Sequence, residues 1–310
     1  MLAEAVLEVP DVDQASRRHM HFMLARAYGE AGDALRAVAA AVAAAGSAKN
    51  QDDLALRLEA MAAAMKLKTG DVGLAGAAGV RRPVFLLGLP GSGRQAVDAV
   101  LNAHPQAVFA GELPTLEELA TREGMYPGSL AQLDPVRAAI IRDAYLQRLT
   151  DIPKVGACII DAGDNLVHLG LVARLWPNAR VVTVERDPAD TAVASYLSGI
   201  AERFGWAAGP AELGRYVAAW HGLLRHWREV LPLNFHTLHF DEMNREPEQV
   251  LRGLFNFLGL APSDEEIDFS DQGMAAGTLE HMFGYRLSLE WPSGLAHGYR
   301  GLLAPLFATL

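Results

Sequence analysis

The most constraining feature of this 310-residue sequence is a glycine-rich turn that directly follows a short apolar run. The run is Pro83-Val-Phe-Leu-Leu87, and the turn is Gly88-Leu-Pro-Gly-Ser-Gly93. A continuous apolar run predicts a parallel strand that is buried on both faces. Backbone N–H groups of such a turn face one concavity, and the N-terminus of a following helix adds partial positive charge. The segment therefore predicts a phosphate or sulfate site, although turns of this kind also serve merely to connect a strand to a helix.

The spacing of this turn comes close to the Walker A pattern of nucleoside triphosphatases. Gly88 and Gly93 are separated by four residues, and Arg94-Gln95 follows where that pattern has Lys and then Ser or Thr. The missing hydroxyl normally holds Mg²⁺, and the lysine reaches the outer phosphates. Because Gln95 is a poor substitute for the hydroxyl, a Mg²⁺-dependent nucleotide kinase is the least favoured interpretation.

The sequence around the turn alternates between strand-like and helix-like segments. Two further apolar runs, Ala157–Ile160 and Ala179–Val184, are predicted strands, and residues 134–149 and 166–175 are predicted helices. Alternation of this kind indicates an α/β domain with a parallel sheet flanked by helices. We assign this domain to residues 82–310.

Residues 1–67 differ from the rest of the chain, since they are rich in alanine and predicted to be helical. One helix ends near Gly32, a second follows Asp33, and a third is predicted over 52–66. The predicted apolar stripe of the second helix consists of Leu35, Val38, Ala39 and Val42, beside a row of small residues at Ala34, Ala37, Ala41 and Ala45. This helix–turn–helix pattern is similar to one tetratricopeptide repeat, and a generic helical hairpin is an equal alternative.

Residues 68–81, rich in Gly and Ala, are predicted to link these helices to the α/β domain. A lone repeat cannot bury its apolar face, so it should pack on that domain or on a protein partner.

Charge and composition narrow the function further. The formal net charge is −10 and no run of Lys and Arg is present, which argues against a nucleic-acid surface. The single cysteine, Cys158, excludes an intramolecular disulfide. No apolar stretch reaches the length of a membrane span, and the first residues lack a secretory pattern, so we expect a soluble cytoplasmic protein that does not act at a membrane.

A series of short segments, in the same order along residues 83–306, resembles a known enzyme family. The matching segments include Asn102–Pro105, Ala110–Pro114, Trp176–Val182, Arg186–Thr191, His226–Pro232, Phe240–Met243, Phe257–Leu260 and Leu303–Leu306. Together they are similar to bacterial sulfotransferases that carry tetratricopeptide repeats and use 3′-phosphoadenylyl sulfate, and to the tyrosylprotein branch of that family. The resemblance implies a sulfotransferase-like, P-loop-like sheet.

The resemblance also implies an activity and a set of site residues. It implies metal-independent transfer of a sulfuryl group from 3′-phosphoadenylyl sulfate to a hydroxyl or amine of a small molecule or peptide. Arg186 would hold the 3′-phosphate, with Ser195 beside the expected serine position, and Glu112 would be the catalytic base. The turn would grip the 5′-phosphosulfate, with Arg94 as a substitute cation, through Pro90, Gly91, Ser92, Gly93, Arg94 and Gln95.

Several family positions carry different residues in this chain. The expected loop cation is Gly91, two expected threonines are Arg94 and Gln95, an expected lysine is Ala162, the expected serine is Ala194, and a Gly-Arg-x-Arg element reads Gly294-Leu-Ala-His297. Each lost charge-assisted hydrogen bond costs about 1.5–3 kcal/mol. A degenerate homologue that acts as a binding or scaffold protein is therefore the main alternative.

Two of the retained residues also have structural interpretations. Arg186 could pair on the surface with Asp187 or Asp190, and Glu112 could simply precede a helix, because acids favour first turns.

Overall fold

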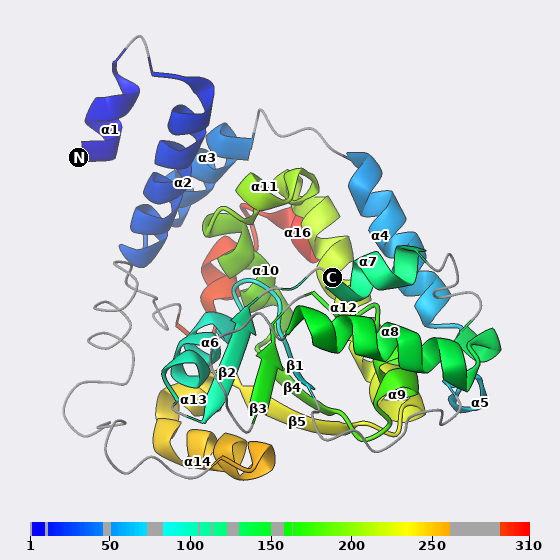
Figure 1. Cartoon of the computed structure of the whole chain (residues 1–310). Helices are drawn as coiled ribbons and strands as arrows, with labels where there is room; N and C mark the ends of the chain where they lie inside the picture. The colour runs from blue at the N-terminus through cyan, green and yellow to red at the C-terminus, as the bar shows by residue number, and fades with distance from the viewer. Residues whose placement is uncertain are drawn as a thin grey trace.

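The fold is built around a five-stranded, all-parallel sheet with the strand order β2-β3-β1-β4-β5 (Figure 1). It is seen in a computed structural model, which describes residues 2–9, 12–45, 51–72, 83–104, 106–111, 113, 115–122, 130–149, 158–162, 164–260 and 292–310. The strands are β1 Pro83–Leu87, β2 Ala107–Gly111, β3 Cys158–Asp161, β4 Arg180–Glu185 and β5 Asn234–His239. The predicted α/β class with a parallel sheet is confirmed.

The two strands that the sequence analysis did not predict, β2 and β5, are the two edges of the sheet. The residues of β5, Asn-Phe-His-Thr-Leu-His, are mostly half-buried or exposed, so they do not form an apolar run. The central strand β1 is buried at every position, which is why its sequence carried the clearest signal.

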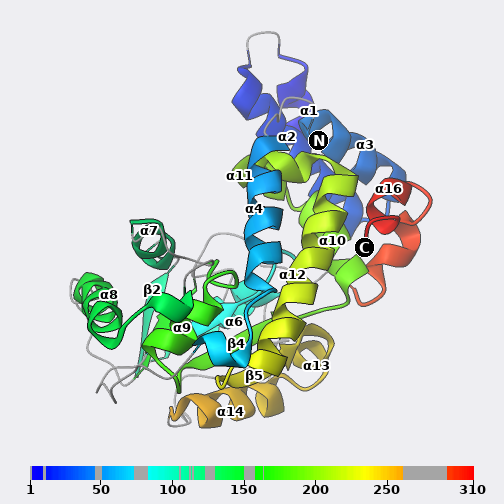
Figure 2. The ribbon, with the colours of Figure 1, turned by 90° about the vertical axis from the view of Figure 1, so that its right-hand side faces the viewer.

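Helices cover both faces of the sheet, and β1 shows the division because its side chains alternate between the two faces. Val84 and Leu86 pack with α6 Arg94–Ala103, α13 Phe240–Arg245 and α14 Pro247–Leu258. Phe85 and Leu87 belong to the larger core that contains α8 Pro135–Arg148, α9 Leu169–Leu175, α10 Pro188–Leu197 and α12 Pro210–Val230. Figure 2 shows α13 and α14 on one side of the sheet and α12 on the other.

This arrangement places a topological switch point at the carboxyl ends of β1 and β4. The two strands are neighbours, with Leu87 opposite Thr183. The helix after β1 lies on one face of the sheet, and the helices after β4 lie on the other. In open α/β sheets, ligands bind where neighbouring connections diverge in this way. The glycine-rich turn follows β1 and Arg186 follows β4, so the fold brings them to the same edge.

The N-terminal helices α2 Gln14–Glu30, α3 Ala34–Ala45 and α4 Gln51–Ala64 contribute to the larger core, and α1 Leu2–Leu7 contacts α2. The face that α3 buries consists of Ala37, Ala40, Ala41 and Ala44, whereas Leu35 and Val42 are 68% and 52% exposed. The predicted apolar stripe was therefore wrong at Leu35 and Val42, although Val38 packs against the core. The predicted row of small residues is buried at Ala37 and Ala41. Small residues allow α2 and α3 to approach closely, and the side chains of Leu35 and Val42 are left outside.

The helical hairpin of α2 and α3 packs against the α/β domain. Phe22 of α2 lies so close to Gly199 that a Cβ atom at residue 199 would come within 2.9 Å of its ring. Farther along, Arg57 of α4 forms an ion pair with Asp164 at 3.5 Å. The stretch predicted as a linker begins with the short helix α5 Thr69–Val72, and residues 73–82 lie outside the described structure.

The remaining short elements connect or close these layers. They are α7 Thr115–Arg122, α11 Ile200–Arg203, α16 Ala304–Phe307 and the 3₁₀ helices η1 Leu130–Gln132, η2 Gly205–Ala208 and η3 Leu295–Tyr299. The C-terminus returns to α12, where the Thr309 hydroxyl donates to the Ala211 carbonyl at 3.0 Å. Among the described helices, none has the length and apolarity needed to cross a membrane.

Candidate functional site

The glycine loop, defined here as Gly88–Gly93, needs glycine at its turning points. Gly91 and Gly93 have φ angles of +81° and +89°, which favour glycine. A Cβ atom on Gly93 would also overlap the ring of Phe240. The loop is closed internally by the Ser92 amide, which donates to the Leu89 carbonyl at 3.0 Å.

The tight packing of Gly91 explains why no cation stands at this position. A Cβ atom there would lie 2.8 Å from the Ser195 nitrogen and 2.9 Å from the Thr191 carbonyl oxygen, both in α10. Such contacts are closer than a Cβ atom tolerates. A lysine or arginine at residue 91 would therefore push the loop away from α10. The close approach of α10 therefore fits glycine at residue 91 and excludes a larger residue.

Ser92 places a hydroxyl inside the loop. The residue is 2% exposed, and its Oγ finds no hydrogen-bond partner within the described parts of the chain. A Cβ atom on Gly88 would come within 2.9 Å of this Oγ, so glycine at residue 88 keeps the space beside the hydroxyl free. An unpaired buried hydroxyl costs stability, and in a native protein it needs an explanation, such as a ligand that the hydroxyl contacts.

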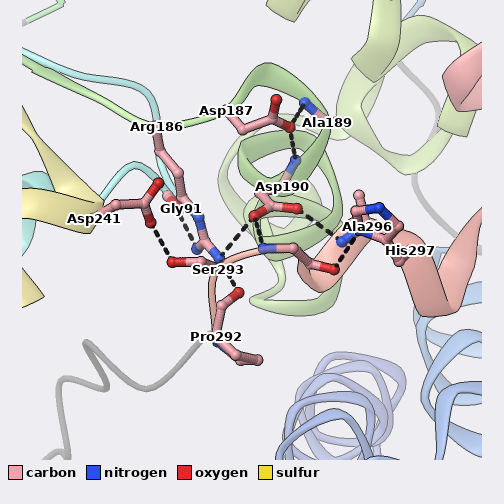
Figure 3. Close-up of polar contacts among 11 residues, drawn as sticks. Gly91, Arg186, Asp187, Ala189, Asp190, Asp241, Pro292, Ser293, Ala296 and His297 are labelled. Carbon is pink, nitrogen blue, oxygen red and sulfur yellow. Dashed lines mark hydrogen bonds and ion pairs between the residues drawn. The ribbon is translucent and has the colours of Figure 1, made fainter.

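Arg186 lies beside the loop, as the sequence predicted. Its Nη1 donates to the Gly91 carbonyl at 3.4 Å and its Nη2 donates to the Pro292 carbonyl at 2.8 Å (Figure 3). Nη2 also lies 3.6 Å from the Asp190 carboxylate, and the guanidinium stacks over the Phe240 ring at 4.5 Å. The side chain of Arg186 is fully buried. Its pairing with Asp190 is therefore an interior contact, and not the surface pair that was the alternative.

Burial lowers the pKa of Arg186, and the nearby carboxylate of Asp190 opposes this shift, followed by that of Asp241. Arginine nevertheless stays charged in proteins. The buried cation thus needs the acidic groups around it, and its removal would leave the buried Asp190 without a cationic partner.

A C-terminal segment, Pro292–Ala296, covers the guanidinium. The amides of Gly294 and Ala296 donate to the Asp190 carboxylate at 2.6 and 2.8 Å, and the Ser293 hydroxyl donates to Asp241 (Figure 3). We call Arg186, Asp190, Asp241 and the segment Pro292–Ala296 the Arg186 cluster. The hydrogen bonds of the Arg186 cluster join protein groups to one another, whereas the Ser92 hydroxyl has no partner in the described structure.

The other predicted loop residues make contacts within the protein or face solvent. Arg94 donates from Nη1 to the Ala162 carbonyl and pairs through Nε with Asp98 at 3.6 Å. Gln95 and Pro90 are exposed. The Ser195 hydroxyl donates to the Pro90 carbonyl, which ties α10 to the loop. The structure therefore brings Pro90–Gln95, Arg186 and Ser195 together, with Arg94 directed toward the end of β3.

The last residue of β3 and the segment that follows it add buried polar groups to this edge of the sheet. Asp161 is fully buried and accepts a hydrogen bond from the Tyr145 hydroxyl at 2.6 Å. Burial, with the charge of Asp161, raises the pKa of Tyr145 well above its usual value. The amide nitrogen of Asn165 is also buried, with no partner in the described structure.

Two predicted features carry no site evidence. Glu112, the predicted base, lies outside the described residues. His297, where the resemblance implies an arginine, is exposed, and its Nδ1 lies 3.0 Å from the Gly294 carbonyl. Across the described ranges, no three His, Cys, Asp or Glu side chains are grouped closely enough to hold a metal ion.

A model of the family described as "Sulfotransferase family" matches residues 83–265, which is more than half of the chain. The chain belongs to the sulfotransferase family. The matched region contains the glycine loop, Arg186 and Asp190. The segment Pro292–Ala296, which covers Arg186, lies beyond its end.

Individual sulfotransferase structures and one further protein are similar to this chain at low identity. The sulfotransferase of Alicyclobacillus acidocaldarius is 20% identical, covers 75% of this chain and 95% of its own, and has a TM-score of 0.44. A sulfotransferase from Mycobacterium avium is 16% identical, covers 96% of this chain and 97% of its own, and has a TM-score of 0.41. An uncharacterized protein of Aquifex aeolicus (strain VF5) is 26% identical over 204 residues, which is 61% of this chain. This chain spans only 27% of the length of that relative.

Sequence reasoning missed a polar network that includes Glu185, the residue directly before Arg186. Arg228 of α12 donates to Thr183 at 2.9 Å and to Thr237 at 2.6 Å, and it also pairs with Glu185. The network joins β4, β5 and α12 next to the site. Thr183 and Thr237 are neighbours because β4 pairs with β5. The sequence analysis did not predict β5, so it could not relate these residues to one another.

Proposed function

We propose that this chain transfers a sulfuryl group from 3′-phosphoadenylyl sulfate to a hydroxyl or amine of a small molecule or peptide. The glycine loop would receive the 5′-phosphosulfate, and Arg186 would attract the 3′-phosphate. The observation that carries the proposal is the buried, unpaired hydroxyl of Ser92 inside a loop whose glycines leave no room for a Cβ atom. Such a hydroxyl is a suitable donor to an oxyanion.

The position of Arg186 supports the same proposal. The guanidinium lies 3.4 Å from the Gly91 carbonyl, measured from Nη1, so a nucleotide in the loop would have a cation beside it. Backbone N–H groups at the start of α6 would contribute further donors, because the first turn of a helix leaves them without intrahelical partners. Arg94 would neutralise charge at the 5′ end after turning away from Asp98. Glu112 is proposed as the base on the family resemblance alone.

A second candidate function is a sulfotransferase homologue that binds partners without catalysis. The observation that favours it is the internal pairing of the predicted cations. Arg186 is buried against Asp190, and Arg94 bonds to Ala162 and Asp98. In addition, position 91 has no space for a cation. Such a protein would act through its N-terminal helical hairpin.

A thermal-shift titration separates these functions. Stabilisation by adenosine 3′,5′-bisphosphate without Mg²⁺, together with release of that nucleotide from 3′-phosphoadenylyl sulfate in the presence of a hydroxyl acceptor, supports the transferase. Stabilisation without turnover across acceptor classes favours the binding protein. Stabilisation by ATP only in the presence of Mg²⁺ would instead favour the nucleotide kinase, and indifference to every nucleotide would overturn the donor site. A cytoplasmic location and a protein partner stay predictions.

A further inference from the structure

Asp190 occupies a position in which it competes with any anion that approaches Arg186. One of its carboxylate oxygens, Oδ2, lies 3.6 Å from Arg186 Nη2 and accepts the Gly294 amide at 2.6 Å. The other oxygen, Oδ1, accepts the Ala296 amide at 2.8 Å. The Asp190 side chain is 5% exposed. A cation and two amides thus converge on one internal carboxylate.

This carboxylate links the cation to the chain that covers it. Nη2 of Arg186 donates to the Pro292 carbonyl at 2.8 Å, and the same segment is bonded to Asp190 through Gly294 and Ala296. Because the Arg186 side chain is fully buried under these contacts, an external anion reaches it only if the segment moves. The charge of Asp190 and the position of the segment therefore both oppose the binding of an anion to Arg186.

We propose that Asp190 is a specificity-determining residue of the donor site, an internal counter-anion that the 3′-phosphate of the nucleotide replaces. The proposal rests on the proposed function, since it needs a 3′-phosphorylated nucleotide in the glycine loop. A phosphate carries more charge and more acceptor oxygens than a carboxylate, so it competes well for a guanidinium. A nucleotide without a 3′-phosphate has no group that can replace the Asp190 carboxylate, so Asp190 stays beside Arg186.

The exchange has a consequence that can be measured in the wild-type chain. For the 3′-phosphate to reach the buried Arg186, the segment Pro292–Ala296 must move, and this movement weakens the contacts of Asp190 with the amides of Gly294 and Ala296. We expect saturating adenosine 3′,5′-bisphosphate to speed hydrogen exchange at these two amides at least fivefold, although ligands usually slow exchange near their site. Saturating adenosine 5′-monophosphate should leave the two amides unchanged. Slower or unaltered exchange with bound bisphosphate would overturn the proposal.

A matched pair of variants provides an independent test. Asp190→Asn removes the competing charge, and Asp187→Asn makes the same charge change three residues earlier, where Asp187 caps α10 through the amides of Ala189 and Asp190 at 2.9 and 3.0 Å. Asparagine remains a good helix cap, so this control should fold normally. We expect Asp190→Asn to bind adenosine 3′,5′-bisphosphate about tenfold more tightly, the size of one charge-assisted hydrogen bond. Binding of adenosine 5′-monophosphate should not change.

The outcomes separate the two levels of the proposal. If neither the wild-type chain nor Asp190→Asn binds any adenosine nucleotide in calorimetric titration, the proposed function fails. If both nucleotides bind, but Asp190→Asn shows no gain for the bisphosphate beyond that of Asp187→Asn, the proposed function stands and the role of Asp190 is wrong. A circular dichroism spectrum and an unfolding curve for each variant show that the comparison is made between folded chains.

Discussion

The glycine loop and the Arg186 cluster meet at one edge of the sheet, yet they differ in how their polar groups are satisfied. The loop keeps a buried hydroxyl, Ser92 Oγ, without a partner in the described structure. The cluster surrounds its buried cation with Asp190, the Gly91 carbonyl and the Pro292 carbonyl. A ligand therefore finds donors ready in the loop, whereas in the cluster it must displace contacts that already stabilise the protein.

The largest effect should come from removing the cation of the cluster. Arg186→Ala leaves Asp190 buried without its charged partner, which we expect to lower the free energy of unfolding by about 3–5 kcal/mol. Urea denaturation measures this loss. Arg252→Ala is the control, because its pair with Glu248 is 66% and 59% exposed and should matter little. Equally small losses of unfolding free energy in Arg186→Ala and Arg252→Ala would show that the contacts of the Arg186 cluster do not stabilise the protein.

A smaller loss of stability is expected from the loop backbone. Gly91→Ala forces a Cβ atom into a residue with φ of +81° and toward the Ser195 nitrogen. We expect a loss of about 1–3 kcal/mol in unfolding free energy from the strained conformation, together with loss of detectable nucleotide binding in calorimetry.

The control for this loop variant is Gly222→Ala in α12. A Cβ atom there meets nothing within 4 Å, and alanine favours a helix over glycine by about 0.5–1 kcal/mol. Nucleotide binding that survives Gly91→Ala unchanged would show that the loop does not hold the anion.

The sharpest test of the comparison is Ser92→Ala, because its two effects have opposite signs. Removing an unpaired buried hydroxyl should raise the free energy of unfolding by about 1 kcal/mol. The same change should weaken binding of adenosine 3′,5′-bisphosphate about fivefold, because one donor is lost. Thr191→Val, which removes another buried hydroxyl without a partner in the described structure, should share the gain in stability. A Ser92→Ala variant that loses stability would show that the hydroxyl is already satisfied.

The smallest effect is expected for Arg94→Ala. Its ion pair with Asp98 is partly exposed, at 16% and 20%, and should contribute less than about 1 kcal/mol. If Arg94 replaces the cation that Gly91 excludes, binding of adenosine 3′,5′-bisphosphate falls severalfold. Arg215→Ala, which breaks a surface pair with Glu212, should lower stability similarly and leave binding unchanged. Equal binding by both variants would remove Arg94 from the proposed site.

The sequence predicted the central part of the fold because the physics there is local. The apolar run of β1 and the helix α8, whose first residue Pro135 follows the capping Asp134, were found at nearly the observed bounds. The edge strand β5 was missed because its half-buried and exposed positions do not form an apolar run. The edge strand β2 was missed although its residues, Ala-Val-Phe-Ala-Gly, are apolar. The stripe of α3 was misplaced because alanine contributes little to hydrophobicity, although close packing of helices selects it.

The site was predictable only in part, for a similar reason. The glycine loop and Arg186 follow directly from a strand–turn–helix pattern and a family resemblance. The contacts of Arg186 with Pro292 and Phe240 unite positions that are far apart in the chain, and no pattern in the sequence relates them. Tertiary packing alone decides that this cation is buried and already paired.

A crystal structure of the full chain with adenosine 3′,5′-bisphosphate would test the central claim most directly. The account predicts that an oxygen of the 5′-phosphate lies within hydrogen-bond distance of Ser92 Oγ and of the amides at the start of α6. A bound nucleotide whose 5′-phosphate lies away from the glycine loop, with Ser92 Oγ still unpaired, would contradict it.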